Sequence, residues 1–192
     1  GQTLEIFVKE RKEAHLLIED FMLLANREVA TLMAQKGKSQ EIPFPYRVHD
    51  VPDPDRLMDF QRFARELGFS LQIDTPKQIS KSFNRLAEAA KEDEKLRLLE
   101  PLAIRTMAKA IYTTNNIGHY GLAFDFYTHF TSPIRRYSDV LVHRILDANL
   151  HAIHREDKTN LEARCKHISD RERAAPSRTA ARWGSVRRRG SG

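Results

Sequence analysis

The segment from residue 119 to residue 144 reads HYGLAFDFYTHFTSPIRRYSDVLVHR and joins an aromatic-rich half to a helical half. The aromatic side chains of residues 120–127 predict a short strand or extended segment. Ser132 and Pro133 then predict a helix start, because a serine hydroxyl caps unpaired backbone donors and proline fits the first helical position. Apolar residues follow at helical spacing from Tyr137 to Ala148, which gives this helix a buried side.

Two arginines follow the predicted helix start directly. The helix dipole disfavours Arg135 and Arg136 in a first turn by about 0.3–1 kcal/mol each, so an anion bound there would relieve them. A planar guanidinium gives two parallel hydrogen bonds to a phosphate or carboxylate. The alternative is an ion pair with Asp139, which lies three and four positions further along. Spacing alone leaves both interpretations open.

A second group of polar residues borders the apolar side of the helix predicted for residues 12–36. His15, Glu19, Met22 and Asn26 follow one another at helical steps along this side. Glu19 at such an edge is suited to accept hydrogen bonds from sugar hydroxyls. The alternative is a solvent-exposed glutamate that pairs with His15 or a neighbouring lysine.

Helical spacing of apolar residues recurs along most of the chain. Gly37 and Gly68 are expected to end helices, and Thr75, Pro76 and Gln78 form a capping box that opens another. The sequence therefore predicts a mainly α fold with short β segments, with further helices at residues 53–67, 76–90, 101–112, from 133 onward and within 167–175.

The net charge of +6 is concentrated at the C-terminal end of the chain. Residues 176–192 read PSRTAARWGSVRRRGSG and hold five of the 32 basic residues and no acid, which leaves 27 basic residues against 26 acids elsewhere. A nearly neutral body weakens the argument from bulk charge for nucleic-acid binding. We expect residues 1–175 to form one unit and residues 176–192 to be a disordered or non-native tail, with an RNA-binding arm as the alternative.

The remaining composition bounds the class of protein. No apolar run approaches the length of a membrane-spanning helix, and a single cysteine, Cys165, fits a reducing, cytoplasmic setting. His151, His154, Cys165 and His167 lack the paired spacing of a zinc finger. The acids in HDVPDPD at residues 49–55 are better explained as turn and capping residues than as magnesium ligands.

The segment 119–144 resembles the signature of the RNB catalytic domain, which defines ribonucleases II and R. The flanks agree: residues 10–26 resemble the family's AHxLIEExMLxAN helix, and residues 42–49, IPFPYRVH, resemble its IPxxYRVH segment. The resemblance covers residues 4 to about 175 and is closer to ribonuclease R. The positions that carry it in segment 119–144 are His119, Gly121, Leu122, Tyr127, His129, Phe130, the run TSPIRRY at 131–137, Asp139, His143 and Arg144.

The resemblance implies a processive, magnesium-dependent 3′-to-5′ exoribonuclease that releases nucleoside 5′-monophosphates from the 3′ end of single-stranded RNA. It implies that Arg135 is catalytic and holds phosphate in the transition state. It also implies that Glu19 contacts ribose and helps select RNA over DNA. The residues expected to bind RNA are Glu19, His119, Tyr120, Thr131, Ser132 and Arg136.

The chain also departs from the family pattern. The family's aspartate cluster, which holds magnesium, lies upstream of the residues present, as do most of the aromatic residues that clamp the terminal base. The flanking RNA-binding domains are also absent. We therefore expect the C-terminal half of an α+β RNB domain without metal ligands. It is either a fragment of an exoribonuclease or a catalytically inactive RNA-binding or structural unit. At Pro176 the family's charged helix gives way to the tail, which indicates an altered reading frame or an artificial end.

Overall fold

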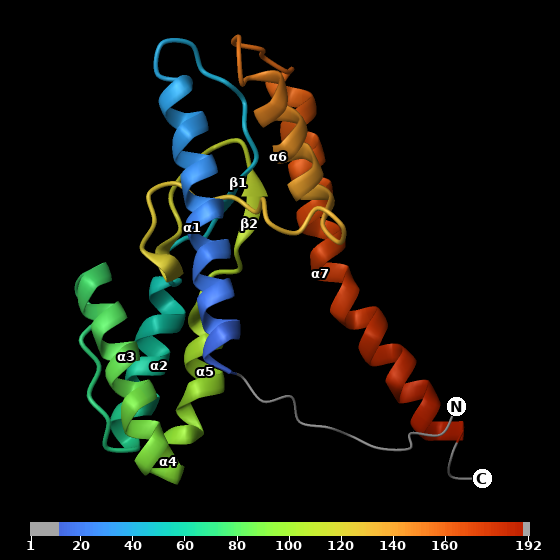
Figure 1. The fold of residues 1–192 in the computed structure, drawn as a ribbon. Coiled ribbons are helices and arrows are strands. Elements are labelled where there is room, and N and C mark those ends of the chain that lie inside the picture. Colours follow the sequence, from blue (N-terminus) through green and yellow to red (C-terminus); the bar gives the residue numbers. More distant parts are fainter. Residues whose placement is uncertain (1–11, 190–192) are drawn as a thin grey trace. The chain divides into compact units, whose positions relative to one another are not determined.

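Helices dominate the part of the chain that the computed structural model describes, which is residues 12–189, with side chains for residues 12–175 (Figure 1). The named strands form one two-stranded sheet. The expectation of a mainly α fold with short β segments is confirmed. In chain order the elements are α1 (Glu13–Lys36), β1 (Tyr46–Val48), α2 (Pro54–Glu66), α3 (Pro76–Glu92), α4 (Glu94–Arg97), α5 (Leu99–Thr106), β2 (Ile111–Thr113), the 3-10 helix η1 (Tyr120–Leu122), α6 (Tyr137–Ala148) and α7 (Lys158–Arg189).

The chain divides into two compact units. Of the described residues, unit 1 comprises 12–47, 112–116 and 124–189, and therefore contains α1, α6 and α7. Unit 2 comprises residues 48–111 and 117–123, and contains α2 to α5 and η1. Unit 1 is thus assembled from three separate stretches of chain.

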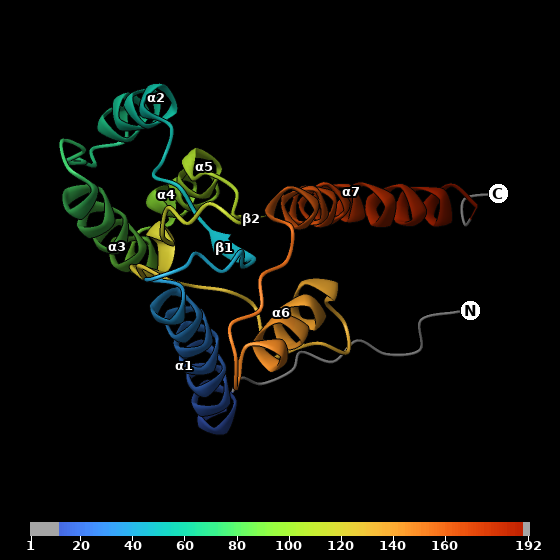
Figure 2. The same ribbon diagram turned by 90° about the horizontal axis from the view of Figure 1, so that it is seen from above.

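Unit 2 is a cluster of four helices around an apolar core, and both ribbon views show these helices gathered together (Figures 1 and 2). The predicted helix starts are confirmed: the Asp53 carboxylate accepts the N–H groups that begin α2, and the Thr75 hydroxyl accepts the N–H of Gln78 in α3. Gly68 follows α2 with a φ of +83°, a conformation that favours glycine. The buried core residues are Phe60, Ala64, Phe69, Leu71, Leu86, Ala90, Leu96 and Leu99.

The core of unit 1 draws on all three of its helices and on the segment before β1. Lys36 at the end of α1 donates to the carbonyl oxygens of Asn149 and Leu150, which follow α6. Glu162 of α7 accepts hydrogen bonds from Thr113 and Thr114, so α7 is fixed to the end of β2. The buried apolar residues include Ala30, Met33, Phe44, Leu141, Val142, Ile145, Leu161 and Cys165.

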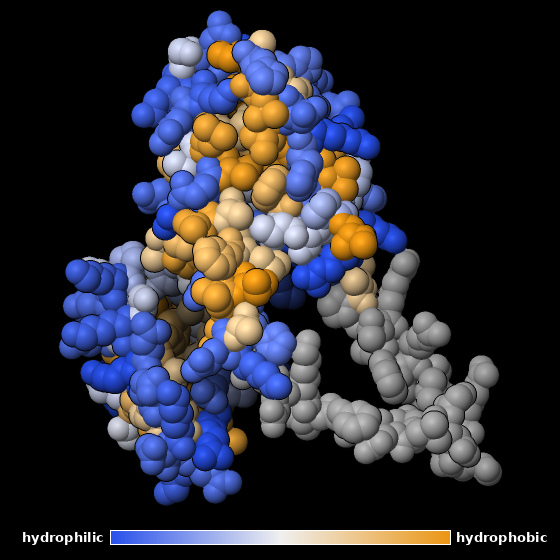
Figure 3. Space-filling view, viewed as in Figure 1, coloured by the Kyte–Doolittle hydropathy of each residue, from blue (hydrophilic) through white to orange (hydrophobic). Residues whose placement is uncertain are grey.

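The apolar side predicted for the first helix is buried only toward the C-terminal end of the helix and is exposed toward its N-terminal end. The buried residues of α1 are Asn26, Ala30 and Met33, whereas Ile18 and Phe21 are each 58% exposed. Figure 3 shows apolar side chains gathered on the face where α1 runs in Figure 1. Exposed apolar surface of this kind is typical of a helix that packs against another protein segment.

Two predicted elements are wrong in part. The helix predicted for residues 101–112 ends at Thr106, and Ile111 and Tyr112 belong to β2 instead. Pairing with β1 and a hydrogen bond from the Tyr112 N–H to Ser169 stabilise this strand, and no local pattern encodes either contact. The segment 120–127 begins as the 3-10 helix η1 rather than a strand, and Ala123 has a left-handed φ of 53°.

The last helix is much longer than predicted. α7 runs from Lys158 to Arg189 and passes through Pro176, where the sequence predicted an interruption. The assignment of residues 176–192 to a separate disordered or non-native tail stays a prediction. Within residues 12–189, no helix combines the length and the apolar character needed to cross a membrane.

Candidate RNA-binding site

Asn26 of α1 anchors the segment that leads into α6. Its side-chain oxygen accepts the N–H groups of Phe130 at 2.9 Å and Thr131 at 3.2 Å. Its side-chain nitrogen donates to the Tyr127 hydroxyl at 3.1 Å. Asn26 is only 4% exposed, so these bonds are shielded from water. The structure thereby gives a positioning role to a residue that the sequence placed only beside Glu19.

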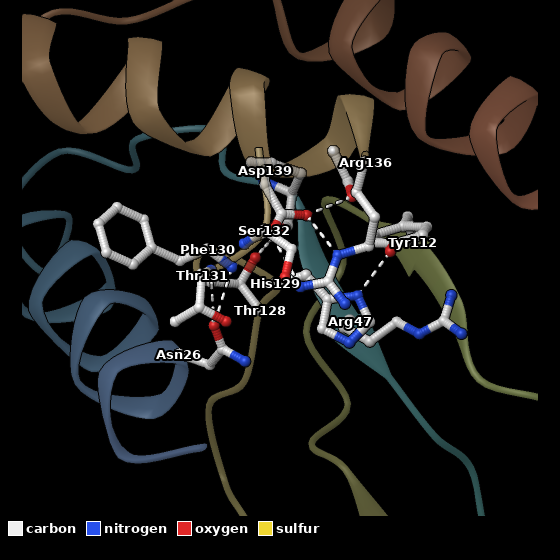
Figure 4. A network of polar contacts seen from close by, with 12 residues as sticks. Asn26, Arg47, Tyr112, Thr128, His129, Phe130, Thr131, Ser132, Arg136 and Asp139 are labelled. Carbon is white, nitrogen blue, oxygen red and sulfur yellow. Dashed lines mark hydrogen bonds and ion pairs between the residues drawn. The ribbon is translucent and has the colours of Figure 1, made fainter. Parts of the chain in front are cut away.

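The Asp139 carboxylate is the centre of a second buried network (Figure 4). It accepts the Ser132 N–H at 2.7 Å and the Ser138 hydroxyl at 3.0 Å. The Arg136 guanidinium donates to it twice, at 2.8 and 2.9 Å. Burial raises the pKa of Asp139. The hydrogen bonds from Arg136, Ser132 and Ser138 lower the pKa by more than burial raises it, so the pKa lies below its ordinary 3.8.

This network corrects the predicted helix start. Pro133 and Arg135 lie in a turn, closed by N–H groups of Arg135 and Arg136 that donate to the Ser132 carbonyl oxygen at 3.2 and 3.1 Å. Arg136 has extended backbone and is the N-cap residue, so α6 begins at Tyr137. Both arginines therefore precede the helix instead of lying in its first turn.

The two arginines also differ in their partners. The ion pair with Asp139, which the sequence left open as an alternative, is confirmed for Arg136. Arg135 is exposed, and among the described residues it makes no ion pair or side-chain hydrogen bond. Arg135 is thus the member of the pair that is available to an anion.

One hollow in unit 1 lies along α1, and we call it the α1 hollow. Its volume is about 250 Å³. The Thr131 hydroxyl oxygen in its wall is buried and has no hydrogen-bond partner among the residues that the structure describes. Glu19 and Arg136 give the lining no net formal charge. The α1 hollow is lined by Glu19, Met22, Leu23, Asn26, Tyr127, His129, Thr131 and Arg136.

A second hollow of unit 1 lies along α7, and we call it the α7 hollow. Its volume is about 510 Å³. Three arginines and one glutamate give its lining a formal charge of +2. Arg136 lines both hollows. The α7 hollow is lined by Tyr112, Arg135, Arg136, Tyr137, Ser138, His167, Ile168, Arg171 and Glu172.

Tyr112 and His129 extend the polar network behind Arg136, and the sequence assigned neither residue a role. The Tyr112 hydroxyl and His129 Nδ1 are 2.6 Å apart (Figure 4). Burial raises the pKa of the Tyr112 phenol, so it remains protonated at neutral pH. Arg47 lies over the Tyr112 ring, 4.5 Å from its centroid, and pairs with Glu172 at 2.7 Å.

The structure places the predicted site residues in two groups. Glu19, Thr131, Arg135 and Arg136 line the hollows of unit 1. Ser132 is buried beside them and contributes its backbone N–H to Asp139.

His119 and Tyr120 belong to unit 2. His119 stacks on His49, with ring centroids 5.1 Å apart, and the Tyr120 hydroxyl donates to the Pro76 carbonyl oxygen at 2.9 Å. In the part of the chain that the structure describes, no three His, Cys, Asp or Glu side chains lie close enough to hold a metal ion.

These features match a known class of protein. The family model of the RNB domain matches residues 1–152 of this chain. The chain therefore belongs to the RNB domain family.

The relatives within that family include ribonuclease R of Mycoplasmopsis pulmonis, which is 39% identical over 172 residues that cover 88% of this chain and 22% of that protein. The chain thus spans about a quarter of the length of the curated relatives that it matches.

Two solved structures show the same fold. Mycoplasma genitalium RNase R in complex with ribose-methylated single-stranded RNA has a TM-score of 0.68 and 30% identity, and the match covers 84% of this chain and 25% of that one. Yeast Ssd1, a pseudonuclease, has a TM-score of 0.67 and 25% identity over 83% of this chain and 20% of that one. The fold therefore occurs in both a ribonuclease and a pseudonuclease.

Proposed function

We propose that this chain is the RNA-contacting part of a 3′-to-5′ exoribonuclease of the ribonuclease R type. Arg135 holds a phosphate group of the RNA, and Glu19 accepts hydrogen bonds from a ribose hydroxyl. The observation that carries the proposal is the arrangement around Arg136, which lines a hollow without net charge on one side and a cationic hollow on the other.

The chemistry of the two hollows fits the two parts of a nucleotide. A ribose is neutral and rich in hydroxyl groups, which suits the Glu19 carboxylate and the unpaired Thr131 hydroxyl of the α1 hollow. A phosphate is an anion, which suits the exposed guanidinium of Arg135 in the α7 hollow. Arg136 lines both hollows, and its ion pair with Asp139 holds it in place.

The activity of the whole protein belongs to the same proposal. The longer protein would shorten single-stranded RNA processively from its 3′ end in the cytoplasm and release nucleoside 5′-monophosphates. Magnesium would be held by residues outside this chain, in the upstream half of the domain. The exposed apolar side of α1 supports contact with such a further segment. In unit 2, His119 and Tyr120 are proposed as additional RNA contacts, and in unit 1 Ser132 is proposed to act through its backbone.

Replacing Arg135 with alanine tests the phosphate contact. We expect the 192-residue chain to bind a fluorescein-labelled single-stranded oligoribonucleotide about 10-fold to 100-fold more weakly, because one charge-assisted hydrogen bond to phosphate is lost. Fluorescence anisotropy at fixed salt measures the dissociation constant, since phosphate contacts depend on ionic strength. Arg164→Ala removes an exposed arginine of α7 that lines neither hollow and is the matched control. Equal affinities for the two variants would refute the role of Arg135.

A second candidate function is RNA binding without catalysis. Among the described residues, no three possible metal ligands lie close together, and this favours RNA binding without catalysis for the isolated chain. The likeness to a pseudonuclease shows that the fold does not require activity. We expect the isolated chain with magnesium to bind single-stranded RNA without releasing nucleoside 5′-monophosphates, as measured by denaturing gel and thin-layer chromatography. Release of monophosphates that Arg135→Ala abolishes would contradict this expectation and assign the activity to the chain itself.

A further inference from the structure

We infer that the α7 hollow is a nucleotide-phosphate site that Arg171 and His167 of α7 line together with Arg135. This inference deepens the proposed function and rests on it. The new elements are the two α7 residues, for which the sequence gave no role in RNA binding.

The first argument is the charge that the hollow leaves uncompensated. Arg171 is exposed, and within the described residues neither it nor Arg135 makes an ion pair. Glu172, the acid in the lining, has both carboxylate oxygens bonded to Arg47, at 2.7 and 3.3 Å. The acid is therefore neutralised by a guanidinium outside the lining, and two unpaired guanidinium groups remain for an anion.

The second argument is the position of the α6 N-terminus. Tyr137 and Ser138, the first two residues of α6, line the hollow, and the N-cap residue Arg136 supplies no side-chain cap for this helix end. The first N–H groups of a helix and its dipole favour an anion. The helix end and the two unpaired arginines thus act on the same hollow.

The third argument is the set of side chains that line the hollow around α7. His167 and Arg171 are four residues apart on α7, so their side chains lie one above the other on the same face of the helix. Their neighbours in the lining are Ile168 and the ring of Tyr137, which is 52% exposed. An aromatic ring beside a cationic pocket fits a base next to its phosphate, since bases stack on aromatic side chains. A nucleotide therefore fits this hollow better than a simple anion does.

A phosphate with an adjacent base can come from two sources, the bound RNA strand or a free nucleoside 5′-monophosphate. Isothermal titration calorimetry of the 192-residue chain with AMP, with adenosine and with a single-stranded oligoribonucleotide separates them. We expect Arg171→Gln to weaken AMP and RNA binding about 5-fold to 10-fold and to leave adenosine binding unchanged. Because Arg171 is exposed and unpaired, this substitution does not disturb folding, which circular dichroism checks.

Arg164→Gln is the matched control, because it removes the same charge from α7 outside the hollow, and we expect less than a 2-fold effect. An effect of Arg171→Gln on RNA alone supports the site and identifies the strand phosphate as its ligand. An effect on AMP alone identifies the free nucleotide, and the expected effect on both ligands shows that the site accepts the phosphate of either one. If Arg171→Gln matches Arg164→Gln for both ligands, the inference is overturned. The proposed function still stands in that case if Arg135→Ala weakens RNA binding.

Discussion

Replacing Asp139 with alanine is expected to lower the free energy of unfolding of unit 1 by about 3–5 kcal/mol, because removal of the buried partner leaves the charge of Arg136, whose side chain is only 25% exposed, uncompensated. The Asp139 side chain is fully buried and accepts four hydrogen bonds. Without it, the Ser132 N–H and the Arg136 guanidinium lose their acceptor. Urea denaturation followed by circular dichroism measures the loss.

Asp147→Ala is the matched control, because Asp147 is an exposed aspartate of the same helix. We expect that change to stay within about 0.5 kcal/mol of the parent chain. Because the native pKa of Asp139 lies below 3.8, its contribution is fully present above its ordinary pKa and is lost as pH falls through the native pKa. The destabilisation by Asp139→Ala should therefore be full at pH 7 and shrink in strong acid. A loss at pH 7 no larger than that of Asp147→Ala would show that the buried pair does not stabilise the unit.

Replacing Asn26 with alanine is expected to cost about 2–4 kcal/mol of stability, because buried donors left without an acceptor cost about 1–3 kcal/mol each. Asn26 accepts the N–H groups of Phe130 and Thr131 and donates to Tyr127. Its loss removes the hydrogen bonds that Asn26 makes between α1 and the segment that carries Thr131. We therefore also expect weaker RNA binding, which the anisotropy assay at a temperature well below the unfolding midpoint would detect.

The exposed Gln35 of α1 gives the control variant Gln35→Ala, which removes an amide from the same helix without touching that segment. We expect its unfolding curve and its RNA affinity to match those of the parent chain. A protein in which Asn26→Ala and Gln35→Ala unfold at the same urea concentration would rule out the anchoring role of Asn26.

The parts of the fold that depend on local patterns were predictable from the sequence. The bounds of α1, α2 and α3 follow from apolar spacing, from the caps Asp53 and Thr75 and from Gly68. The start of α6 was not predictable, because the serine–proline signal at 132–133 competes with a hydrogen bond from the Ser132 backbone to a side chain of the helix itself. The Ser132 N–H donates to the Asp139 carboxylate, seven residues further along, and α6 begins only at Tyr137. β2 and α4 were not predicted for a different reason, because each element is too short to show a periodicity of its own.

The candidate site was predictable as a set of residue types but not as a geometry. The spacing predicted an anion near Arg135 and Arg136 or an ion pair with Asp139. The structure pairs Arg136 with Asp139 and places Arg135 in the lining of the α7 hollow. The contribution of α7 was invisible in sequence, because His167 and Arg171 are ordinary exposed helix residues until folding brings them beside Arg135. The contact between His129 and Tyr112 was also not predictable, because the sequence placed Tyr112 in a helix.

The ion pair between Arg47 and Glu172 has a consequence for the order in which the chain folds during synthesis. The two residues are 125 positions apart, and Arg47 is also stacked on Tyr112. Unit 2 consists almost entirely of residues 48–111, so its helices emerge from the ribosome together and need little loop closure to meet. Unit 1 acquires its last segment only when α7 has been made. A nascent chain halted before residue 158 would therefore carry a folded unit 2 beside an open unit 1, and its exposed apolar surface would be a target for chaperones.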